Sequence, residues 1–508
     1  MSQSYLKSYN IPENWCWAKI GNLLDVIRGA SPRPKGDPRF FGGDIPWIMI
    51  SDVTKSKGKF ISRTRDTVTE EGSKRSRYLK KGTLILSNSG SVCIPKILAV
   101  DGCIHDGFVA FPERIENLEK LYFYYYFEYI RPLIINANRQ GVTQVNLNTT
   151  IVKDIDIPLP PHPEQQRIVT KIEELFTRLD AGMETMKQVQ AQLQRYRQSV
   201  LKAAVEGRLT AEWRGQHKDE LEAADKLLEH ILKERREKWE AEQLAKYKTQ
   251  GKTPLKNWQD KYKEPTPLNT SDLPDLPEGW IWTTMDNISI KITDGEHIRP
   301  KMVKKGVPFL SAKNVQDNSI IFDGILYVSQ DDAARFRQRC NPERNDILIV
   351  SRGATVSRTC VINVDKEFCL LGSVILIKPS RFLRGKFIAY MLKSSTIQKT
   401  MIELSGSTAQ QAIYIRDIRN LLIPIAPMTE QEIITDKVER IFSNIEEVDM
   451  IIKTELKRGQ SLRQSILKHA FDGKLVPQDP NDEPASILLE RIKAEKAKPK
   501  KSKQLEMF

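Results

Sequence analysis

The chain contains PLPPHPEQQ at 158–166 and RQSVLKAAVEGRL at 197–209, and it repeats them as PIAPMTEQE at 424–432 and RQSILKHAFDGKL at 463–475. Between 158–209 and 424–475 the offset is a constant 266 residues, and 18 of 52 positions are identical. Similarity at a fixed offset indicates an internal repeat. We therefore expect two similar working ends related by a pseudo-twofold axis, which would suit a linear and nearly symmetric partner.

The repeat extends beyond these two blocks once small gaps are allowed. IPENWCW at 11–17 matches LPEGWIW at 276–282, and DIPWIMISDV at 44–53 matches GVPFLSAKNV at 306–315. GVTQVNL at 141–147 matches GSTAQQAI at 406–413, and ADKLLEHI at 224–231 matches ASILLERI at 485–492. The whole chain is thus predicted to be a duplicated unit of a variable globular block, a long helix and a shorter helix.

Each repeated block leads into an uninterrupted amphipathic pattern of about 43 residues, or about 64 Å of helix. Apolar residues alternate at spacings of four and three, as in a heptad seam. Gly207 and Gly473 are predicted to end the two helices. Pairing of the seams predicts an antiparallel two-helix coiled coil with one globular block at each end, although such a coiled coil can also serve only for spacing or dimerisation. The seam residues are Ile168, Ile172, Leu175, Leu179, Met186, Val189, Leu193, Tyr196 and Val200 in the first helix, and Ile434, Val438, Ile441, Ile445, Val448, Ile452, Leu462 and Ile466 in the second.

The globular blocks combine short β-like runs such as IPWIMI, TLILSNSG, DILIVSRG and SVILIKP with turns and one or two helices, which predicts the α+β class. LYFYYYFEYI at 121–130 is too short to span a bilayer and is predicted to be a core helix. The predicted segments are a first globular block (1–157), the first long helix (158–211), a charged helix with a Pro/Lys-rich connector (212–275), a second globular block (276–423), the second long helix (424–476), and a short helix with a basic tail (477–508).

The charge balance is basic. The chain has 79 Lys+Arg against 65 Asp+Glu, a net charge of +14. Residues 28–81 hold 14 Lys/Arg against 6 acids, and residues 335–358 hold six Arg against two acids. Matched basic blocks favour nucleic acid as the partner, with an ordinary solvated basic face as the alternative.

Polar and basic residues gather in the turns of both blocks. Arg, Lys, Asn and Gln read base edges, whereas Ser, Thr and backbone amides hold phosphates. The predicted DNA-binding residues are Arg28, Ser31, Arg33, Lys35, Lys55, Lys57, Arg139, Thr143, Gln144 and Asn146 in the first block, and His297, Arg299, Lys301, Lys313, Asn314, Arg352, Thr408, Gln410 and Gln411 in the second.

Signatures of catalysis are missing from the sequence. It has no P-loop, no GxGxxG motif, no amino-methyltransferase tetrapeptide and no convincing nuclease cluster. His105 and His297 lie at non-equivalent places of the two copies, and Asp106 and Asp346 are interpreted as turn or capping residues. Six scattered cysteines without metal-ligand spacing, together with an N-terminus lacking an apolar run, predict no metal site and a reducing cytoplasmic location.

The LPEGW-like openings, the PLPP..EQ block before a long helix, RQSVLKAA..G.L and their recurrence closely resemble the DNA-specificity subunit of type I restriction-modification systems. The resemblance implies two target recognition domains that each read half of a bipartite duplex DNA sequence across a fixed spacer. It also implies a cytoplasmic, non-catalytic chain that binds no cofactor itself. The insertion at 219–277 is not part of the minimal duplicated pattern.

The same resemblance implies that two modification subunits, which methylate adenine with S-adenosylmethionine, dock on the helical regions. Restriction subunits that use ATP and magnesium would join this core. Two other classes remain open, a standalone enzyme and a coiled-coil scaffold that binds DNA without base readout. The residues expected to serve docking or helix pairing are Glu164, Gln165, Ile168, Ile172, Leu175, Arg197, Gln198, Glu430, Gln431, Ile434, Val438, Ile441, Arg463 and Gln464.

Overall fold

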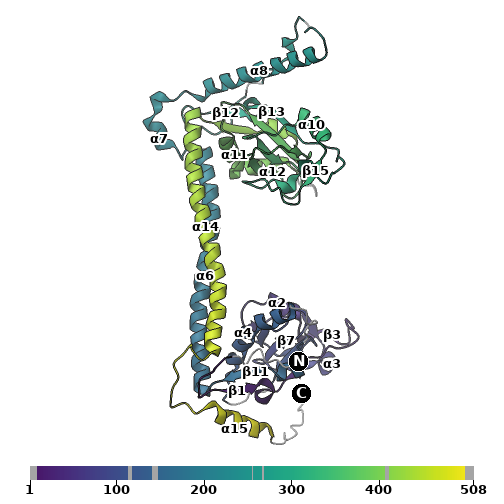
Figure 1. Cartoon of the computed structure of the whole chain (residues 1–508), viewed down its shortest axis with the longest axis vertical. Helices are drawn as coiled ribbons and strands as arrows, with labels where there is room; N and C mark the ends of the chain where they lie inside the picture. Colours follow the sequence, from purple (N-terminus) through teal and green to yellow (C-terminus); the bar gives the residue numbers. More distant parts are fainter. Residues whose placement is uncertain are drawn as a thin grey trace. The chain divides into compact units, whose positions relative to one another are not determined.

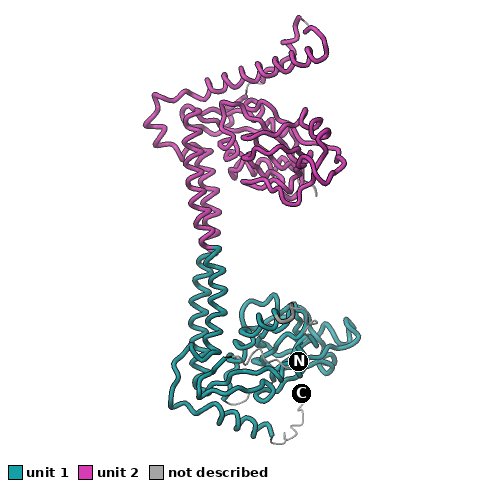
Figure 2. Tube along the Cα trace, in the orientation of Figure 1, with its two compact units in different colours: residues 1–187, 453–508 teal, residues 188–452 magenta. Residues whose placement is uncertain are grey.

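The chain forms two compact units in its computed structural model (Figure 2). The structure describes residues 9–112, 117–139, 147–254, 256–265, 268–406 and 411–497, with only the backbone described at 137–139. Unit 1 comprises residues 1–187 and 453–508, and unit 2 comprises residues 188–452. Each unit combines one globular block with a part of each of the two long helices, α6 (His162–Val205) and α14 (Met428–Phe471), labelled in Figure 1. Unit 1 is therefore built from two stretches that are far apart in the sequence.

The globular block of unit 1 contains three small sheets. One antiparallel pair joins β1 (Cys16–Lys19) to β11 (Asp156–Leu159). The five-stranded sheet has the order β2 (Ile27–Arg28), β10 (Phe108–Phe111), β7 (Leu84–Ser87), β8 (Pro95–Leu98), β4 (Phe60–Ile61). The four-stranded sheet has the order β5 (Asp66–Val68), β3 (Phe41–Ile48), β9 (Gly102–Ile104), β6 (Arg77–Leu79). The strands predicted from IPWIMI and TLILSNSG are confirmed as β3 and β7.

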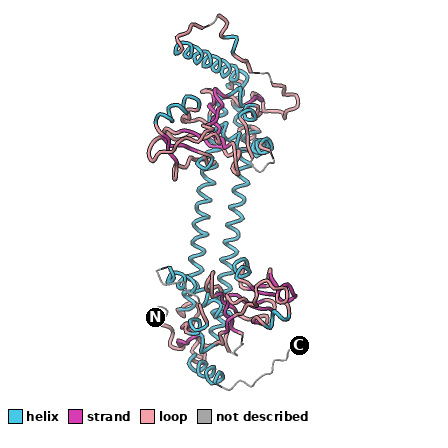
Figure 3. Tube along the Cα trace, turned by 90° about the vertical axis from the view of Figure 1, so that its right-hand side faces the viewer, coloured by secondary structure: helices cyan, strands magenta, loops and turns pink. Residues whose placement is uncertain are grey.

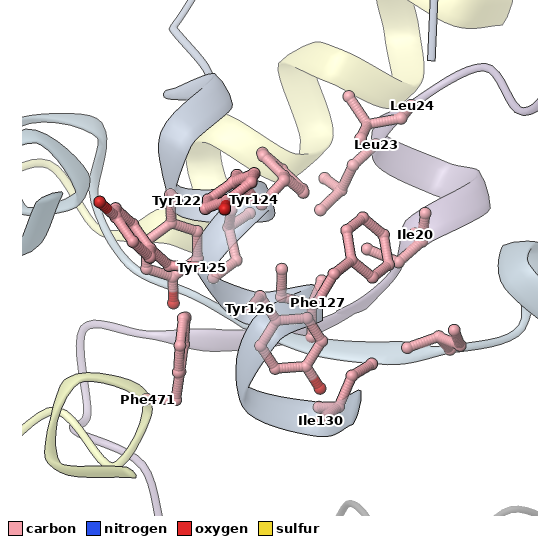
Figure 4. Packing of buried hydrophobic residues seen from close by; sticks show 14 of the residues in the cluster. Ile20, Leu23, Leu24, Tyr122, Tyr124, Tyr125, Tyr126, Phe127, Ile130 and Phe471 are labelled. Atoms are coloured by element: carbon pink, nitrogen blue, oxygen red, sulfur yellow. The ribbon is translucent and has the colours of Figure 1, made fainter. Parts of the chain in front are cut away.

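The main core of unit 1 surrounds the aromatic helix α4 (Lys120–Arg139). Tyr122, Tyr126 and Phe127 of α4 are fully buried, so the predicted core helix is confirmed. Phe471, at the end of α14, packs its ring 5.2 Å from Tyr122 and 5.0 Å from Tyr126 (Figure 4). The C-terminal segment thus completes the core of the N-terminal block. The other helices of unit 1 are α1 (Ile20–Leu23), α2 (Ile50–Lys55), α3 (Glu70–Lys74), α5 (Thr149–Lys153) and α15 (Ala485–Ala497).

The globular block of unit 2 is built in the same way. An antiparallel pair joins β12 (Ile281–Thr284) to β20 (Leu422–Ile425), with Trp282 opposite Pro424 just as Trp17 lies opposite Pro158 in unit 1. A four-stranded sheet has the order β13 (Ser289–Asp294), β19 (Val374–Pro379), β16 (Ile347–Val350), β17 (Thr359–Val361), which confirms the strands predicted from DILIVSRG and SVILIKP. A three-stranded sheet has the order β15 (Leu326–Val328), β14 (Val307–Leu310), β18 (Cys369–Leu370). In both units the strands lie within the globular block, and the α6 and α14 segments are helical (Figure 3).

Helices cover the sheets of unit 2. The apolar faces of α11 (Gly385–Lys393) and α12 (Ser395–Leu404) are buried in its main core, with Phe387 and Met401 fully buried. The remaining helices are α7 (Ala211–Gln216), α8 (Ala224–Thr249), α9 (Met285–Ile288), α10 (Gln330–Arg339), α13 (Ile415–Arg419), and the short 3-10 turns η1 (Lys218–Glu220), η2 (Gln259–Lys261) and η3 (Ala312–Asn314).

The charged helix α8 has two different halves. Ala224, Leu227 and Ile231 are buried in the core of unit 2, and the backbone N–H of Ala224 donates to the carbonyl of Gly279. The equivalent hydrogen bond lies at the start of α15 in unit 1, where the backbone N–H of Ala485 donates to the carbonyl of Asn14. Beyond Glu234 no α8 side chain is fully buried. The sequence match between 224–231 and 485–492 therefore corresponds to one shared packing position.

The two long helices begin and end at corresponding residues. Both are 44 residues long; Pro163 lies in the first turn of α6, where a proline costs no helical hydrogen bond, and Pro427 immediately precedes α14. Gly207 and Gly473 follow the helix ends with φ of 64° and 69°, which confirms the predicted ends. Among the described residues, no helix has the length and apolar character needed to cross a membrane.

Within each unit, α6 and α14 lie side by side in opposite directions. In unit 1, Leu179 and Met183 face Gly459. In unit 2, the Gln190 side chain donates to Asp449 at 2.7 Å. The seam prediction is wrong for three residues, because the side chains of Tyr196, Val448 and Leu462 are 52%, 40% and 49% exposed. The next residue in each case, Arg197, Asp449 or Arg463, faces the partner helix instead and bonds to a polar side chain on it. Polar pairing between the helices thus replaces apolar packing at these positions.

Candidate nucleic-acid interface

Four of the predicted DNA-binding residues of unit 1, Arg28, Ser31, Arg33 and Lys35, lie in one of two neighbouring loops. We call residues 28–35, after β2, and 104–108, after β9, the loop pair of unit 1. The backbone N–H of Gly29 donates to the carbonyl of Phe108 at 2.9 Å, and Ala30 N–H donates to the carbonyl of Ile104 at 3.3 Å. A Cβ at position 29 would lie 2.1 Å from the carbonyl oxygen of His105. Only glycine permits this approach, so the loops are held together at backbone level.

Asp106 organises the polar side chains of this loop pair. Ser31 Oγ donates to Asp106 Oδ1 at 3.0 Å, and Arg28 Nε donates to the Asp106 carbonyl at 3.3 Å. The Arg33 guanidinium lies 3.9 Å from Asp106 Oδ2, while its side chain remains 71% exposed. The sequence therefore correctly grouped Arg28, Ser31 and Arg33, but it treated the carboxylate that positions them as a turn residue.

His105 lies beside this carboxylate, with its Nδ1 3.0 Å from Asp106 Oδ1. Burial lowers the pKa of His105, and this effect outweighs the opposing charge of Asp106; the positive charges of Lys35 and Arg33 lower it further. The Gly107 N–H donates to His105 Nδ1 at 2.9 Å, which fits a neutral ring. The positive charge of the loop pair therefore comes from Arg28, Arg33 and Lys35.

The equivalent loops of unit 2 make the same backbone contacts. We call residues 294–301 and 370–374 the loop pair of unit 2. Gly295 N–H donates to the carbonyl of Val374 at 3.2 Å, and Glu296 N–H donates to that of Leu370 at 2.7 Å. A Cβ at Gly295 would lie 2.1 Å from the Leu370 carbonyl oxygen, the same distance as at Gly29. Both backbone hydrogen bonds are offset from their counterparts in unit 1 by 266 residues.

A His–Asp pair also lies at the loop pair of unit 2, but on the other loop. His297 Nε2 is 2.9 Å from Asp294 Oδ2, and the His297 ring packs against Gly372, which occupies the place of Asp106. Arg339, at the end of α10, donates to Asp294 Oδ1 and to its carbonyl, each at 3.0 Å. His105 and His297 are non-equivalent in sequence, as expected, yet each lies beside an aspartate in the loop pair of its own unit.

Arg352 borders a shallow cavity of about 290 Å³ next to the loop pair of unit 2. Asp294, His297, Tyr414 and Arg416 line it as well. The backbone N–H of the residue after Arg352 donates to the carbonyl of Gln411, so this position is close to the cavity. Arg299 and Lys301 are exposed on the first loop of the pair. Unit 2 therefore gathers His297, Arg299, Lys301, Arg352 and Gln411 around one edge of the block.

The other predicted DNA-binding residues lie elsewhere. Lys55, the last residue of α2, and Lys57, in the turn that follows, are exposed; buried Lys96 holds this turn by donating to the carbonyl of Ser56 at 3.1 Å. Lys313 is exposed on η3. Six predicted positions fall outside the described residues or side chains, namely Arg139, Thr143, Gln144, Asn146, Thr408 and Gln410.

The prediction that Asn314 binds DNA is corrected by the structure. Its Oδ1 accepts from Ser311 N–H at 2.9 Å, and its Nδ2 donates to the carbonyl of Ile321 at 3.0 Å. Both ends of the amide are thus used to fold the turn that contains it. Asn314 stabilises the turn instead of presenting an amide to a base.

Glu164, Gln165, Glu430 and Gln431 are also corrected, because all four are fully buried and bonded inside their own unit. Trp15 Nε1 donates to Glu164 at 3.0 Å, and Trp280 Nε1 donates to Glu430 at 2.8 Å. The two glutamines each hold a helix start, with Gln165 donating to the Pro160 carbonyl at 3.0 Å and Gln431 to the Ala426 carbonyl at 2.9 Å. These residues join the block to its helix and offer no surface for docking.

The apolar residues predicted for docking or helix pairing contribute to the cores of the two units. Ile168 and Ile172 are fully buried in unit 1, and Ile434 and Val438 are fully buried in unit 2. Leu175 and Ile441 are half-buried against the same cores. Gln198 and Gln464 are exposed at corresponding places on the two helices. Of the residues predicted for docking or helix pairing, only Gln198 and Gln464 have exposed side chains that neither pack in a core nor pair across the helices.

Sequence reasoning missed several residues of the loop pairs, and a signal existed for some of them. GASPRPK at 29–35 and GEHIRPK at 295–301 share a glycine and an RPK triplet at the 266-residue offset. This match would have identified the loop pairs directly. Asp294, Arg339 and Arg416 had no such signal, because only the packing of α10 and α13 brings the two arginines to the loop. No group of three or more potential metal ligands occurs among the described residues.

Comparison with known proteins identifies the same family. Residues 12–195 and 242–458 match the family described as Type I restriction modification DNA specificity domain. The chain is 26% identical over 375 residues to the specificity subunit of the type I restriction enzyme EcoBI of Escherichia coli, covering 72% of this chain and 69% of that one. It is 22% identical over 512 residues to the specificity subunit of EcoKI of Escherichia coli (strain K12), covering 96% of both chains.

Solved structures show the same fold. A chain from work on complex assembly and conformational transition of the type I R-M system superposes with a TM-score of 0.64 at 19% identity, covering 92% of this chain and 100% of that one. The HsdS subunit of Thermoanaerobacter tengcongensis superposes with a TM-score of 0.53 at 19% identity, covering 92% and 99%. The matched family covers more than half of the chain and both globular blocks. The chain therefore belongs to the family of DNA-specificity subunits of type I restriction-modification systems.

Proposed function

We propose that each globular block reads one half of a bipartite duplex DNA target. The observation that carries this proposal is the repeated loop pair, which in both units presents exposed basic side chains beside a His–Asp pair. Arg33, Lys35, Arg299 and Lys301 would position the duplex through its phosphates. The side chains specific to each unit, such as Ser31 and Arg352, would then read base edges.

We further propose that α6 and α14 form an antiparallel coiled coil that fixes the spacer between the half-sites. Helices of 44 residues are about 66 Å long. Such a length would let two blocks reach major grooves on one face of DNA, separated by a turn or more of about 34 Å. The internal repeat with its 266-residue offset supports this view, because a tryptophan of each block donates to the matching glutamate at the start of each long helix.

A specificity subunit of such a system is non-catalytic, since the catalytic subunits are separate chains. We propose that this chain places two modification subunits, and through them the restriction subunits, on the selected DNA. Exposed Tyr196 and Leu462, which correspond at the 266-residue offset, together with Gln198 and Gln464, are the surface positions that we expect such subunits to contact. S-adenosylmethionine, ATP and magnesium would be bound by those partners.

Mapping of methylated adenines in DNA from cells that express the complete system tests this function. We expect one bipartite motif with a fixed spacer. Exchange of residues 9–157 for those of a relative with another target should change one half of the motif only. A change in both halves would contradict modular reading.

A coiled-coil scaffold that binds DNA without base readout is the alternative. It predicts equal affinity for all duplexes of one length in competition at fixed salt. A preference of the purified assembled complex for the mapped motif over a duplex with one altered half-site would exclude it.

A further inference from the structure

An aromatic residue on each long helix lies between two partners from different elements. In unit 1, the ring of Phe176 on α6 meets Tyr125 of α4 edge-on, with centroids 5.7 Å apart at 84°. The guanidinium of Arg463, on α14, lies over the Phe176 ring at 4.1 Å. Arg463 also pairs with Asp180, one turn further along α6. One cluster thus connects the globular block to both long helices.

Unit 2 contains the same cluster with the roles of the two helices exchanged. Phe442 on α14 meets Tyr390 of α11 edge-on, with centroids 5.9 Å apart at 78°. The guanidinium of Arg197, on α6, lies over the Phe442 ring at 4.8 Å and donates to Glu446 at 3.2 Å. Phe, Arg and carboxylate each correspond to those of unit 1 at an offset of 266 residues. We call the two clusters the Tyr–Phe–Arg clusters.

The parts of each cluster differ in how much they can contribute to stability. Phe176 and Phe442 are 7% and 9% exposed, so they belong to the core. Asp180 and Glu446 are both 61% exposed, and an ion pair of this kind contributes little to stability. Its effect is geometric, because it holds the guanidinium in place over the ring. The arginines therefore define orientation more than stability.

The location of the clusters suits this role. Along α6, Phe176 is the last buried residue in the core cluster of unit 1, following Ile168 and Ile172. A contact at the margin of an interface restrains tilting more strongly than one at its centre, since it acts at a longer lever arm. The cluster also includes the second helix, so that tilting of the block would have to break the contact with Arg463.

We propose that Arg463 and Arg197 are positioning residues that set the stringency of the spacer between the two half-sites. The proposal rests on the proposed bipartite reading of DNA. The cation–π contact and the ion pair keep each block at one angle on the helix pair. Without them, the block tilts on its core contacts and tolerates targets whose spacer is one base pair shorter or longer.

The test uses the assembled complex and duplexes that carry the mapped motif with the native spacer or with one base pair removed or added. Binding is measured by competition at fixed salt for the native chain, Arg463→Gln and Arg197→Gln. Selectivity for the native spacer should fall roughly two- to fivefold in each variant, the size expected for loss of one partly exposed cation–π contact. Discrimination against altered bases in either half-site should stay unchanged.

Arg458→Gln is the matched control. Arg458 lies on the same helix, is 77% exposed and pairs only locally with Glu455 three residues away. It should leave spacer selectivity unchanged. Arg463→Lys keeps the charge but loses the planar contact, so it should relax the spacer as well. Thermal unfolding should show that all variants fold.

Unchanged spacer selectivity in both glutamine variants would overturn the proposal, as would an equal loss of affinity for all spacers. Lost base discrimination with intact spacer selectivity would overturn it too. The proposed function itself fails in a different way, namely if the native complex prefers neither the motif nor any spacer.

Discussion

The indole nitrogen of Trp280 donates a hydrogen bond of 2.8 Å to the carboxylate of Glu430, which lies 150 residues further along the chain. Trp15 and Glu164 form the same bond at 3.0 Å in the other unit. The remaining partners differ. Arg214 donates to both oxygens of Glu430, whereas Glu164 accepts from the neutral amide of Gln478 at 2.6 Å. In unit 2 the charge of Arg214 therefore compensates that of the Glu430 carboxylate, whereas in unit 1 the Glu164 carboxylate accepts from the neutral side chains of Trp15 and Gln478.

The two glutamates should respond differently to neutralisation. Glu430→Gln leaves the guanidinium of Arg214, which is 14% exposed, without its carboxylate, and we expect a loss of about 3–5 kcal/mol in the free energy of unfolding. Glu164→Gln keeps a hydrogen-bond acceptor for Trp15 and strands no charge, so the change should stay within about 1 kcal/mol. Urea unfolding of both variants measures the difference. Equal losses would contradict the role given to Arg214.

Glu164 should also make stability depend on pH. Burial raises the pKa of Glu164 above its ordinary value, although the bonds from Trp15 and Gln478 oppose this shift. Between the ordinary pKa of a carboxyl group and the raised one, the folded chain binds more protons than the unfolded chain. The native protein should therefore lose stability relative to Glu164→Gln as pH rises from about 4.5 through the raised pKa.

Glu174→Gln is the control with the opposite sign. Glu174 bonds to Lys171 at 2.9 Å, which lowers the pKa of this carboxyl group. Relative to Glu174→Gln, the native protein should gain stability as pH rises through that lowered pKa towards the ordinary one. Difference curves from urea unfolding at a series of pH values test both signs. Curves of the same sign would refute the assignment.

Two glycines of the helix pair offer a further matched comparison. A Cβ at Gly459 would lie 3.2 Å from Met183 Sδ and 3.5 Å from Leu179 Cδ1, whereas nothing lies within 4 Å of a Cβ at Gly182. Gly459→Leu should destabilise unit 1 by about 1–3 kcal/mol because the helices cannot separate freely. Gly182→Leu should stabilise it by about 0.5–1 kcal/mol through helix propensity. Destabilisation by Gly182→Leu of the same size as by Gly459→Leu would show that the helix contact is not responsible.

Reading of the half-sites should be separable by single arginine variants. Arg33→Gln is expected to weaken or relax recognition of one half-site, and Arg352→Gln that of the other, because the two residues belong to different blocks. The cost should be about 1–3 kcal/mol for a base contact, whereas a phosphate contact would lower the salt dependence of binding by about one unit. The same expectation holds for Lys35, Lys301, Gln144 and Gln410.

Competition binding of the assembled complex to duplexes with one altered half-site gives the measurement. Arg178→Gln serves as the control, since Arg178 pairs with Glu174 on α6 and lies outside the loop pairs. Loss of both half-sites from one substitution would count against independent reading.

The sequence predicted the elements of this fold that arise from local patterns. The helix ends at Gly207 and Gly473, the core helix around Tyr122, and the strands β7 and β16 all follow from periodicity, glycine or apolar runs. The predicted seam was partly wrong because a heptad pattern assumes an apolar residue at every position where the two helices meet. Asp449 and Gln190 fill such a position with a hydrogen bond, which no apolar pattern can reveal.

The candidate site was predicted only in part for a related reason. Composition identified the exposed Arg33 and Lys301, but it could not tell them from Asn314, whose amide is consumed by its own turn. Nor could it find Arg339, which reaches Asp294 only because α10 packs beside β18. The function of a polar side chain depends on which neighbours already satisfy it, and this information lies in tertiary contacts.

The division of unit 1 between residues 1–187 and 453–508 has a consequence for how the protein is made. On the ribosome, residues 453–497 emerge only after all of unit 2 has been synthesised. Until then, the surface of Tyr122 and Tyr126 that later receives Phe471 stays open to water. The block that is translated first thus completes its folding last, and in the meantime a nascent chain exposes a tyrosine-rich face that chaperones could protect.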